Sequence, residues 1–261
     1  MRADKFLAER FGSRTKAAEE IEKGRVLVNG KVVRPKDEIL PTDELSFLVP
    51  EEYFVSNGGY KLSKALKDFS FSCDGLICAD IGASTGGFCD CLLQNGAKKV
   101  YAIDVGESLL HESLKKDERI VSLENVNARY LTADDLPEKV DLATADVSFI
   151  SLKHILTPLF SITKPTGQAL VLCKPQFECE GKHIGKSGIV QPSFHKKILE
   201  KVLSYCDDAG WKYKDITFAP VRKNKNVEYV LSLQKAKDGV TKEKMLSRLD
   251  ELSIEIKKGE K

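Results

Sequence analysis

The chain has 261 residues, of which 42% are hydrophobic and 31% are charged, and its net charge is only +2. This composition is typical of one large globular domain with a small one beside it, and it excludes a uniformly cationic nucleic-acid binder. No apolar run approaches the ~20 residues of a membrane span, and the charged start MRADKFLAERF is unlike a secretion signal. We therefore expect a cytoplasmic protein with no membrane partner.

The seven cysteines predict reduced thiols, because an odd number does not suit a disulfide framework. Cys89 and Cys91 stand in a C-x-C pair with no second cluster at zinc-site spacing. A structural zinc site normally needs four ligands, and the four histidines form no ligand motif. We therefore predict no metal site.

The first 48 residues read as a small α+β unit. Residues 1–36 hold ten basic and five acidic residues, which gives this segment a net charge of +5. Two helical patterns are followed by a helix stop at Gly24, and Asn29-Gly30 between apolar pairs predicts a hairpin. DELSFLV adds a strand. The natural partner of such a basic module is nucleic acid, although a solvated helical surface would give the same charge count.

This order of elements, with the stretch SRTKAAEEIEKGRVLVNGKVV, resembles the S4 RNA-binding domain over residues 1–48. The resemblance implies that the second helix and the loop after it contact structured RNA. The basic residues that it places on RNA are Arg2, Arg14, Lys16, Arg25 and Lys31.

Residues 49–59 predict a linker, and strands alternate with helices from residue 60 to residue 238. The strands are expected at 76–81, 99–104, 120–124, 140–147, 168–174, 213–218 and 227–233. Such alternation predicts a mainly parallel α/β sheet with helices on both faces. The last two strands are too close in sequence for a crossover helix, so we expect an antiparallel pair at one edge. This is the arrangement of the Rossmann-like class I methyltransferase sheet. Residues 239–261 carry apolar residues at helical spacing, and this pattern favours a terminal helix docked on the domain over a helix that binds a partner.

The stretch CADIGASTGGFCDCLL predicts a strand, a glycine-rich turn and a helix. Ser84 stands where a dinucleotide-binding loop needs its second glycine, and no P-loop pattern is present. The pattern D-x-G-x-x-x-G-G instead resembles the S-adenosyl-L-methionine loop of methyltransferases. The resemblance implies cofactor contacts from Asp80, Gly82, Ser84, Thr85, Gly86 and Gly87. A packing turn without a ligand is the alternative.

Two further strand ends carry candidate cofactor residues. Asp104 ends the next strand, where it could accept hydrogen bonds from ribose hydroxyls. Asn127 comes after the third strand and is a candidate for contact with adenine, as are Arg129, Asp134 and Asp135. For each of these four residues an ordinary polar loop is an equally good reading.

The residues after the later strands suggest the methyl acceptor. Asp146 is followed by Val147 and Ser148, so the double proline of many base-modifying enzymes is absent, and the chain has no Cys-Pro for C5-cytosine chemistry. Instead, four ionisable residues are expected at one edge of the sheet. They are Lys61, Asp146, Lys174 and Glu228.

This constellation resembles the ribose 2′-O-methyltransferases of the FtsJ-like family, and with the S4 module in front the chain resembles the TlyA or hemolysin-A-like group. The matching stretches lie between residues 56 and 233 and include DVSFISL, KPQFE and NVEYVLSL. The resemblance implies methylation of a cytidine 2′-hydroxyl in ribosomal RNA, with the four ionisable residues as a catalytic tetrad. The RNA and the nucleotide stay open.

The chemistry suits these residue types. Alignment of a ribose hydroxyl behind the methyl group contributes most to the rate of transfer, since effective molarities reach ~10⁵–10⁸ M. A positioned base adds roughly 10²–10⁴-fold to that rate. Lys174 could contact the hydroxyl as a neutral base or as a charged stabiliser, and Glu228 would fix the lysines. The sequence leaves both roles of Lys174 open.

Two other functions fit the sequence less well. An S4-type RNA-binding protein with a non-catalytic methyltransferase fold would not need the complete glycine loop and tetrad. A hemolysin would be expected to carry an export signal or a membrane segment, and neither is visible. We expect a monomer without a stable protein partner. The glycine-containing stretch 178–191 could be a lid, an RNA-facing loop or a plain surface loop.

Overall fold

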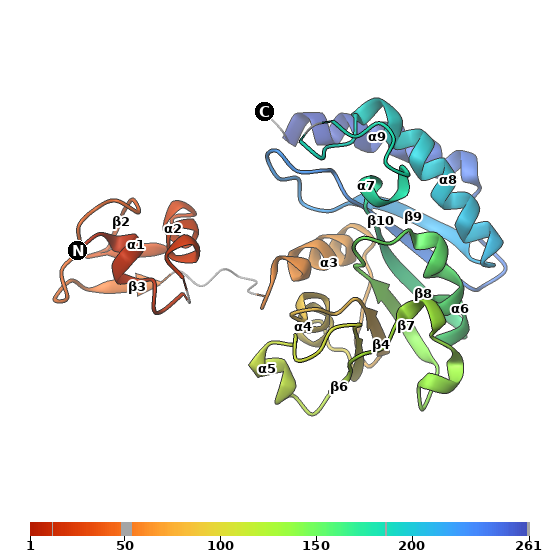
Figure 1. Cartoon of the computed structure of the whole chain (residues 1–261), viewed down its shortest axis with the longest axis horizontal. Coiled ribbons are helices and arrows are strands. Elements are labelled where there is room, and N and C mark those ends of the chain that lie inside the picture. Colours follow the sequence, from red (N-terminus) through yellow and green to blue (C-terminus); the bar gives the residue numbers. More distant parts are fainter. Residues whose placement is uncertain (12, 48–53, 186, 260–261) are drawn as a thin grey trace. The chain divides into compact units, whose positions relative to one another are not determined.

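The computed structural model describes residues 1–11, 13–47, 54–185 and 187–259. The chain forms two compact units, Met1–Tyr53 and Phe54–Lys261 (Figure 1). Each unit has its own hydrophobic core, so each is described by itself. Within the described ranges, no helix combines the length and the apolar character that crossing a membrane requires.

The first unit packs two short helices on a three-stranded antiparallel sheet of order β2-β1-β3. Its elements are α1 (Ala3–Phe6), α2 (Arg14–Glu22), β1 (Val26–Val28), β2 (Lys31–Val32) and β3 (Leu45–Phe47). Asn29 and Gly30 turn the hairpin with positive φ angles of 52° and 74°, which confirms the predicted Asn-Gly turn. Leu7, Ile21 and Ile39 fill the core beneath the sheet.

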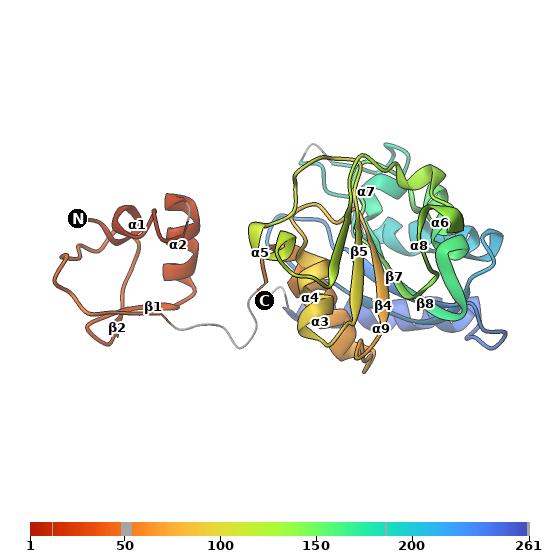
Figure 2. The same ribbon diagram turned by 90° about the horizontal axis from the view of Figure 1, so that it is seen from below.

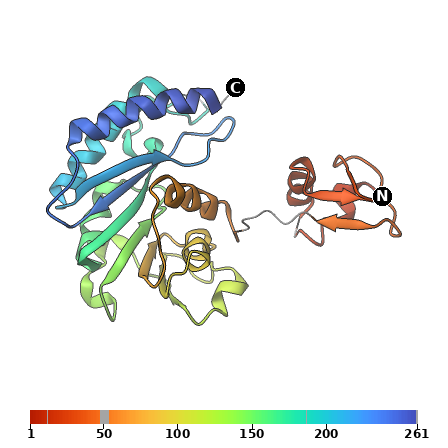
Figure 3. The same ribbon diagram turned by 180° about the vertical axis from the view of Figure 1, so that it is seen from behind.

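The second unit is built on a seven-stranded sheet of order β6-β5-β4-β7-β8-β10-β9. The strands are β4 (Ile77–Ile81), β5 (Lys99–Ile103), β6 (Ile120–Leu123), β7 (Val140–Ala145), β8 (Thr163–Cys173), β9 (Lys212–Phe218) and β10 (Tyr229–Gln234). β4 to β8 run parallel, and β10 runs antiparallel to both β8 and β9. Figure 3 shows this hairpin at the sheet edge, coloured blue. The order confirms the predicted class I methyltransferase arrangement.

Helices cover both faces of the sheet (Figure 2). The longer ones are α3 (Asn57–Asp68), α4 (Gly87–Gln94), α6 (Leu156–Ile162), α8 (His195–Asp208) and α9 (Lys242–Gly259), with the short α5 (Glu112–Lys115) and α7 (Pro175–Glu178) between them. Side chains of α3, α4 and α5 share one core cluster, and those of α6, α8 and α9 share the other. Adjacent residues of β4 alternate between the two clusters, Cys78 in one and Ala79 in the other, as a doubly covered strand requires.

The predicted linker differs from the structure in its second half. Residues 49–53 lie outside the described residues, but Phe54 is only 4% exposed in the second unit, and α3 begins at Asn57. A Cβ atom on Gly59 would lie 2.3 Å from the Phe54 ring. Gly59 is therefore needed for close packing, which sequence composition alone does not distinguish from flexibility.

Other differences concern boundaries. β8 begins five residues before the predicted start and ends at Cys173, so Lys174 is the first residue after the strand. The tail predicted as a separate segment is α9 of the second unit, where Met245, Leu249 and Leu252 are buried in a core cluster. Docking of this helix agrees with the favoured reading of this apolar pattern.

We predict that the sheet centre tolerates truncation poorly. Leu142 of β7 is fully buried, so Leu142→Ala should lower the free energy of unfolding by about 2–5 kcal/mol through lost burial and a residual cavity. Urea unfolding followed by the fluorescence of Trp211, the single tryptophan and a buried residue of the same unit, measures this. Ile254→Ala in α9 is the control, because Ile254 is 59% exposed and should change stability by no more than about 0.5 kcal/mol.

Candidate active site

Four charged side chains from separate elements meet at one edge of the large sheet. Lys61 comes from α3, Asp146 follows β7, Lys174 follows β8, and Glu228 directly precedes β10. β10 runs antiparallel to the other strands, so the residue before it lies at the edge where the parallel strands end. The structure therefore brings together all four residues of the predicted tetrad.

The four charges alternate in sign along a chain of contacts. Glu228 Oε2 lies 2.7 Å from Lys61 Nζ, which lies 3.3 Å from Asp146 Oδ2, and Asp146 Oδ1 lies 2.6 Å from Lys174 Nζ. The side chains are only 9–19% exposed. Charges that are withdrawn from water need such pairing, because an uncompensated one would cost several kcal/mol. The two lysines are thus held on opposite sides of one carboxylate.

Lys174 forms a hydrogen bond in addition to its ion pair with Asp146. Its Nζ donates to Ser148 Oγ at 2.7 Å. An ammonium has three N–H donors. The contact with Asp146 Oδ1 is an ion pair without hydrogen-bond geometry, so at least one N–H of Lys174 is left for a ligand.

A buried glutamate braces the loop that carries Asp146 and Ser148. Glu178 of α7 is 3% exposed and accepts hydrogen bonds from Ser151 Oγ at 2.6 Å and from the Leu152 backbone N–H at 2.8 Å. Burial raises the pKa of the Glu178 carboxyl above its ordinary value. This contact ties the segment after β8 to the segment after β7, so the loops that bear Lys174 and Asp146 are held together.

The glycine-rich turn follows β4 and leads into α4. Gly82 and Gly86 have φ angles of 78° and 92°, and Ser84 adopts 48°. A Cβ atom on Gly82 would lie 3.0 Å from the Asp146 carbonyl oxygen, so the turn passes close to the loop after β7. Glycine is required at such a position both for its backbone conformation and for the close approach.

Asp104 connects this turn to β5. Its Oδ2 accepts the Ser84 backbone N–H at 2.8 Å, and its Oδ1 accepts the Gly106 backbone N–H at 2.8 Å. Each carboxylate oxygen can accept a further hydrogen bond. Asp104 can therefore fix the turn and bind a diol at the same time.

Two adjoining cavities lie beside the turn, and Gly82, Ser84, Asp146 and Ser148 line both of them. The larger cavity, of about 540 Å³, has apolar walls that include Ile103, Val126 and Ile155, with Asp104 on one side. The smaller cavity, of about 180 Å³, is polar and reaches Asp80, Thr85 and Lys174. An apolar cavity with a carboxylate suits a nucleoside, and a polar cavity suits an amino-acid group.

Asp80 lies at the inner end of the smaller cavity and is fully buried. Thr144 Oγ1 donates to its Oδ1 at 2.9 Å, and Cys89 Sγ donates to its Oδ2 at 3.1 Å. Burial disfavours the carboxylate and raises the pKa of Asp80 to about 7, although both hydrogen bonds oppose this shift.

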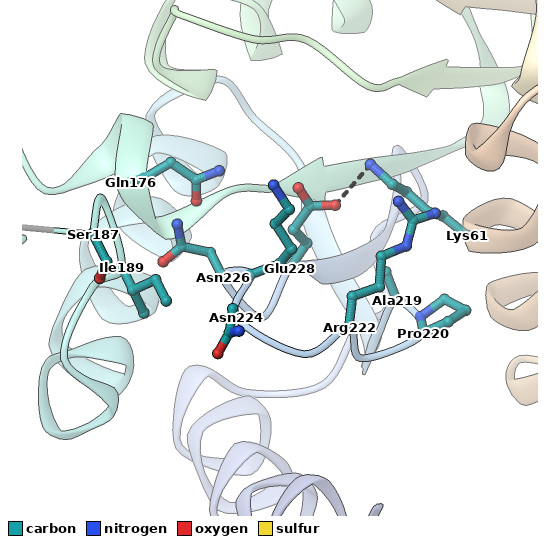
Figure 4. A pocket seen from close by; sticks show the side chains of 11 residues that line it. Lys61, Gln176, Ser187, Ile189, Ala219, Pro220, Arg222, Asn224, Asn226 and Glu228 are labelled. Atoms are coloured by element: carbon teal, nitrogen blue, oxygen red, sulfur yellow. Dashed lines mark ion pairs between the residues drawn. The ribbon is translucent and has the colours of Figure 1, made fainter. Parts of the chain in front are cut away.

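A third cavity, of about 320 Å³, lies on the other side of the tetrad and is lined by Lys61 and Glu228 (Figure 4). It reaches the loop between β9 and β10. The tetrad is therefore flanked by cavities on two sides, as a reaction between two separate ligands requires. The described part of the chain holds no group of three or more His, Cys, Asp or Glu side chains placed to bind a metal ion.

The other residues predicted to contact the cofactor differ in whether they line a cavity. Asn127 and Arg129 line the larger cavity, where Asn127 Oδ1 also caps the turn by accepting the Arg129 backbone N–H at 3.1 Å. Asp134 and Asp135 line none of the three cavities described above, and Asp135 instead caps its own turn through Thr132. Gly86 does not line these cavities either. It packs against α5, because a Cβ atom at Gly86 would lie 2.2 Å from the Leu114 side chain.

The predicted RNA-binding cations of the first unit are mostly engaged in ion pairs. Arg2 and Arg14 both contact Asp4, which is 4% exposed, at 2.7 and 3.1 Å. Arg25 contacts Glu20 at 3.0 Å. Lys31 of β2 is exposed, and the side chain of Lys16 lies outside the described residues.

Sequence reasoning missed three residues of the site: Ser148, Glu178 and Gln176. Ser148 and Glu178 lie in the stretches DVSFISL and KPQFE that carried the resemblance, so their positions were visible but their contacts were not. Gln176 also lies in KPQFE and lines the third cavity, but the sequence alone does not show that its side chain faces a cavity.

The comparisons with known proteins agree with this geometry. The FtsJ-like methyltransferase family matches residues 54–235, and the S4 domain family matches residues 1–45. The chain is 38% identical to the 16S/23S rRNA (cytidine-2′-O)-methyltransferase TlyA of Mycobacterium tuberculosis, over 87% of this chain and 86% of that protein. It is 40% identical to Hemolysin A of Brachyspira hyodysenteriae, over 84% of this chain and 92% of that protein.

A solved structure is similar over the full length. A Streptococcus thermophilus protein that is named a hemolysin is 37% identical, with a TM-score of 0.77 over 100% of this chain and 98% of that chain. Both units of the chain thus have counterparts in these relatives.

We predict a pH-dependent stability from Asp80. Its folded-state pKa lies above the unfolded value, so the folded protein binds the extra proton and the stabilisation is lost as pH rises through about 7. Asp80→Asn cannot lose a proton. The unfolding free energy of the wild type relative to that variant should therefore fall between pH 5 and pH 8 in urea titrations. A difference that is constant with pH would contradict this prediction.

Proposed function

The chain belongs to the FtsJ-like methyltransferase family, and from this premise we propose that it transfers a methyl group from S-adenosyl-L-methionine to the 2′-hydroxyl of a cytidine in ribosomal RNA. The S4 domain in the first unit supports an RNA substrate, presented as free ribosomal RNA or as a ribosomal subunit in the cytoplasm. The relative named for cytidine-2′-O methylation supports the choice of hydroxyl and nucleoside.

The observation that carries the proposal is the chain of contacts Glu228–Lys61–Asp146–Lys174 between the cavities. A hydroxyl acceptor needs a polar group that orients it and stabilises the negative charge that develops on its oxygen. Lys174 lines the smaller cavity and Lys61 lines the third one, so the pair bridged by Asp146 spans the space between the two ligands.

The residues beside the glycine turn fit S-adenosyl-L-methionine. The apolar walls of the larger cavity would hold the adenine, Asp104 would accept hydrogen bonds from the ribose diol, and the polar smaller cavity would hold the methionine part. When bound, the cofactor supplies an electrophilic methyl group on a sulfonium. Ser84 and Gly82 line both cavities, so the turn would contact the cofactor where its nucleoside and its methionine part meet.

For Lys174 we infer the role of a charged stabiliser. Its Nζ forms an ion pair with Asp146 Oδ1 at 2.6 Å and donates a hydrogen bond to Ser148 Oγ at 2.7 Å, and both are contacts that a charged ammonium makes. Its remaining N–H would donate to the 2′-oxygen and align it for attack on the methyl carbon. As the new O–C bond would form, the methyl–sulfur bond of the sulfonium would break and leave a neutral thioether, and the hydroxyl proton would pass to water or to the Asp146 carboxylate.

The geometry favours an enzyme over the alternatives. A non-catalytic RNA-binding protein would have no need for paired buried lysines between two cavities, since such groups are costly to bury. Two relatives carry the name hemolysin, but the tetrad and the glycine turn correspond to methyl transfer.

We predict that Lys174→Met lowers the rate of methyl transfer by roughly 10²–10³-fold, because it removes the group that stabilises the developing charge. The assay combines labelled S-adenosyl-L-methionine with bacterial 16S and 23S rRNA or ribosomal subunits, and maps the labelled ribose. Lys174→Arg keeps the cation and should retain at least about tenfold more activity than Lys174→Met. Equal losses in the two variants would instead indicate a neutral base, and label found only on bases would refute 2′-O transfer.

We also predict that Asp104→Asn weakens S-adenosyl-L-methionine binding by about 10–100-fold, since a charge-assisted hydrogen bond contributes about 1.5–3 kcal/mol. Calorimetric titration of the cofactor measures this dissociation constant. Asp134→Asn is the matched control, because Asp134 is exposed and lines none of the three cavities. The same loss of affinity in both variants would argue against a ribose contact by Asp104.

A further inference from the structure

The cavity of about 320 Å³ on the far side of the tetrad is not used by the proposed binding of the cofactor. Figure 4 shows the side chains of Gln176 and Arg222 directed into the same space as Lys61 and Glu228. Its walls come from α7, from the segment around Ile189 and from the loop between β9 and β10. The volume lies at the lower end of the range for sites that bind small molecules, about 300–1,000 Å³.

Two side-chain amides line this cavity, and they differ in what they bind. Asn226 accepts the Val190 backbone N–H at 2.8 Å and donates to the Gly188 carbonyl at 2.9 Å, so its amide holds the 188–190 segment in place. Gln176 Oε1, by contrast, is buried and has no hydrogen-bond partner among the described residues. A buried carbonyl without a partner costs about 1–3 kcal/mol. Such a cost indicates a group that a ligand or water satisfies.

The rim of the cavity carries cations that no acid neutralises. Arg222 and Lys225 are exposed residues of the loop 219–226, APVRKNKN, which contains no acidic residue. Among the described residues neither of them forms an ion pair, whereas Arg2, Arg14 and Arg25 of the first unit all do. Unpaired cations at a cavity mouth attract anions, because no bound acid has to be displaced first.

We propose that this cavity is an RNA-strand subsite of the second unit, in which Arg222 and Lys225 contact phosphates that flank the target nucleotide and the Gln176 amide contacts a polar group of that nucleotide. The inference rests on the proposed function, since it places the strand relative to the tetrad. In RNA every 2′-hydroxyl is adjacent to the 3′-phosphate of the same nucleotide. A strand whose hydroxyl reaches Lys174 therefore brings phosphates to the Lys61 side, where the unpaired cations lie.

The charge contacts are tested by the salt dependence of RNA binding. The double variant Arg222→Gln/Lys225→Gln should raise KM for bacterial rRNA on the order of tenfold and change kcat by less than about threefold. The slope of log K against log[salt] for that rRNA should decrease in magnitude by about 1.4, because each lost phosphate contact on a single strand contributes about 0.7.

The matched control is Lys212→Gln/Lys237→Gln, which also removes two exposed cations of the second unit but outside the cavity. It should leave KM and the salt slope unchanged. Equal slopes for the wild type and the Arg222/Lys225 variant, with 2′-O transfer by the wild type intact, would overturn the subsite and leave the proposed function standing. A wild type that binds rRNA but transfers no methyl group would instead overturn the proposed function.

Gln176→Leu provides a second, uncharged test. It removes the amide at nearly constant volume, so it should raise KM for rRNA severalfold while the salt slope stays at its wild-type value. An unchanged KM together with a higher melting temperature would mean that Gln176 is only an unsatisfied buried group, and would remove it from the subsite.

Discussion

The need to pair charges at a half-buried sheet edge governs the second unit of this protein. Two lysines withdrawn from water would repel each other, and the carboxylate of Asp146 between them, with Glu228 at the far end, removes that repulsion. Each of the four groups comes from a different element, so the contacts fix α3, the loops after β7 and β8, and the start of β10 at once. The same arrangement that makes burial of the charges tolerable gives the site an oriented cation for hydroxyl chemistry.

The topology of the sheet makes this pairing possible. In an all-parallel sheet, the residue before the final strand would lie at the opposite edge, far from the other strand ends. Because β10 enters antiparallel between β8 and β9, Glu228 and the basic β9–β10 loop lie on the same edge as Asp146 and Lys174. The antiparallel hairpin thus builds a wall of the third cavity, while the glycine turn after β4 lines the other two. The tetrad separates the third cavity from these two.

Two carboxylates of this edge have different surroundings. Asp80, enclosed between Thr144 and Cys89, has its pKa raised to about 7, whereas Asp104 accepts two backbone N–H groups beside the larger cavity. Glu178 is buried like Asp80, and it contacts the loop that bears Asp146 and Ser148 rather than a ligand. The carboxylates near this site therefore differ in their partners: Asp104 accepts backbone N–H groups beside a cavity, Asp146 and Glu228 pair with lysines, and Glu178 holds a loop.

The local patterns of the sequence were enough to predict the alternation of strands and helices, the Asn-Gly hairpin and the glycine turn, because each depends on residue type and spacing within a short segment. The tetrad was predicted from four charged residues on separate elements together with the family resemblance, and the structure brings these side chains together. The contacts of Ser148, Glu178 and Gln176, the docking of 54–59 into the second unit and the engagement of Arg2 and Arg14 by Asp4 could not be predicted in this way. They depend on which atoms of distant segments come within hydrogen-bonding distance. Only the packed sheet, through the direction of β10 and the approach of its loops, decided which charges are paired and which stay available to a ligand.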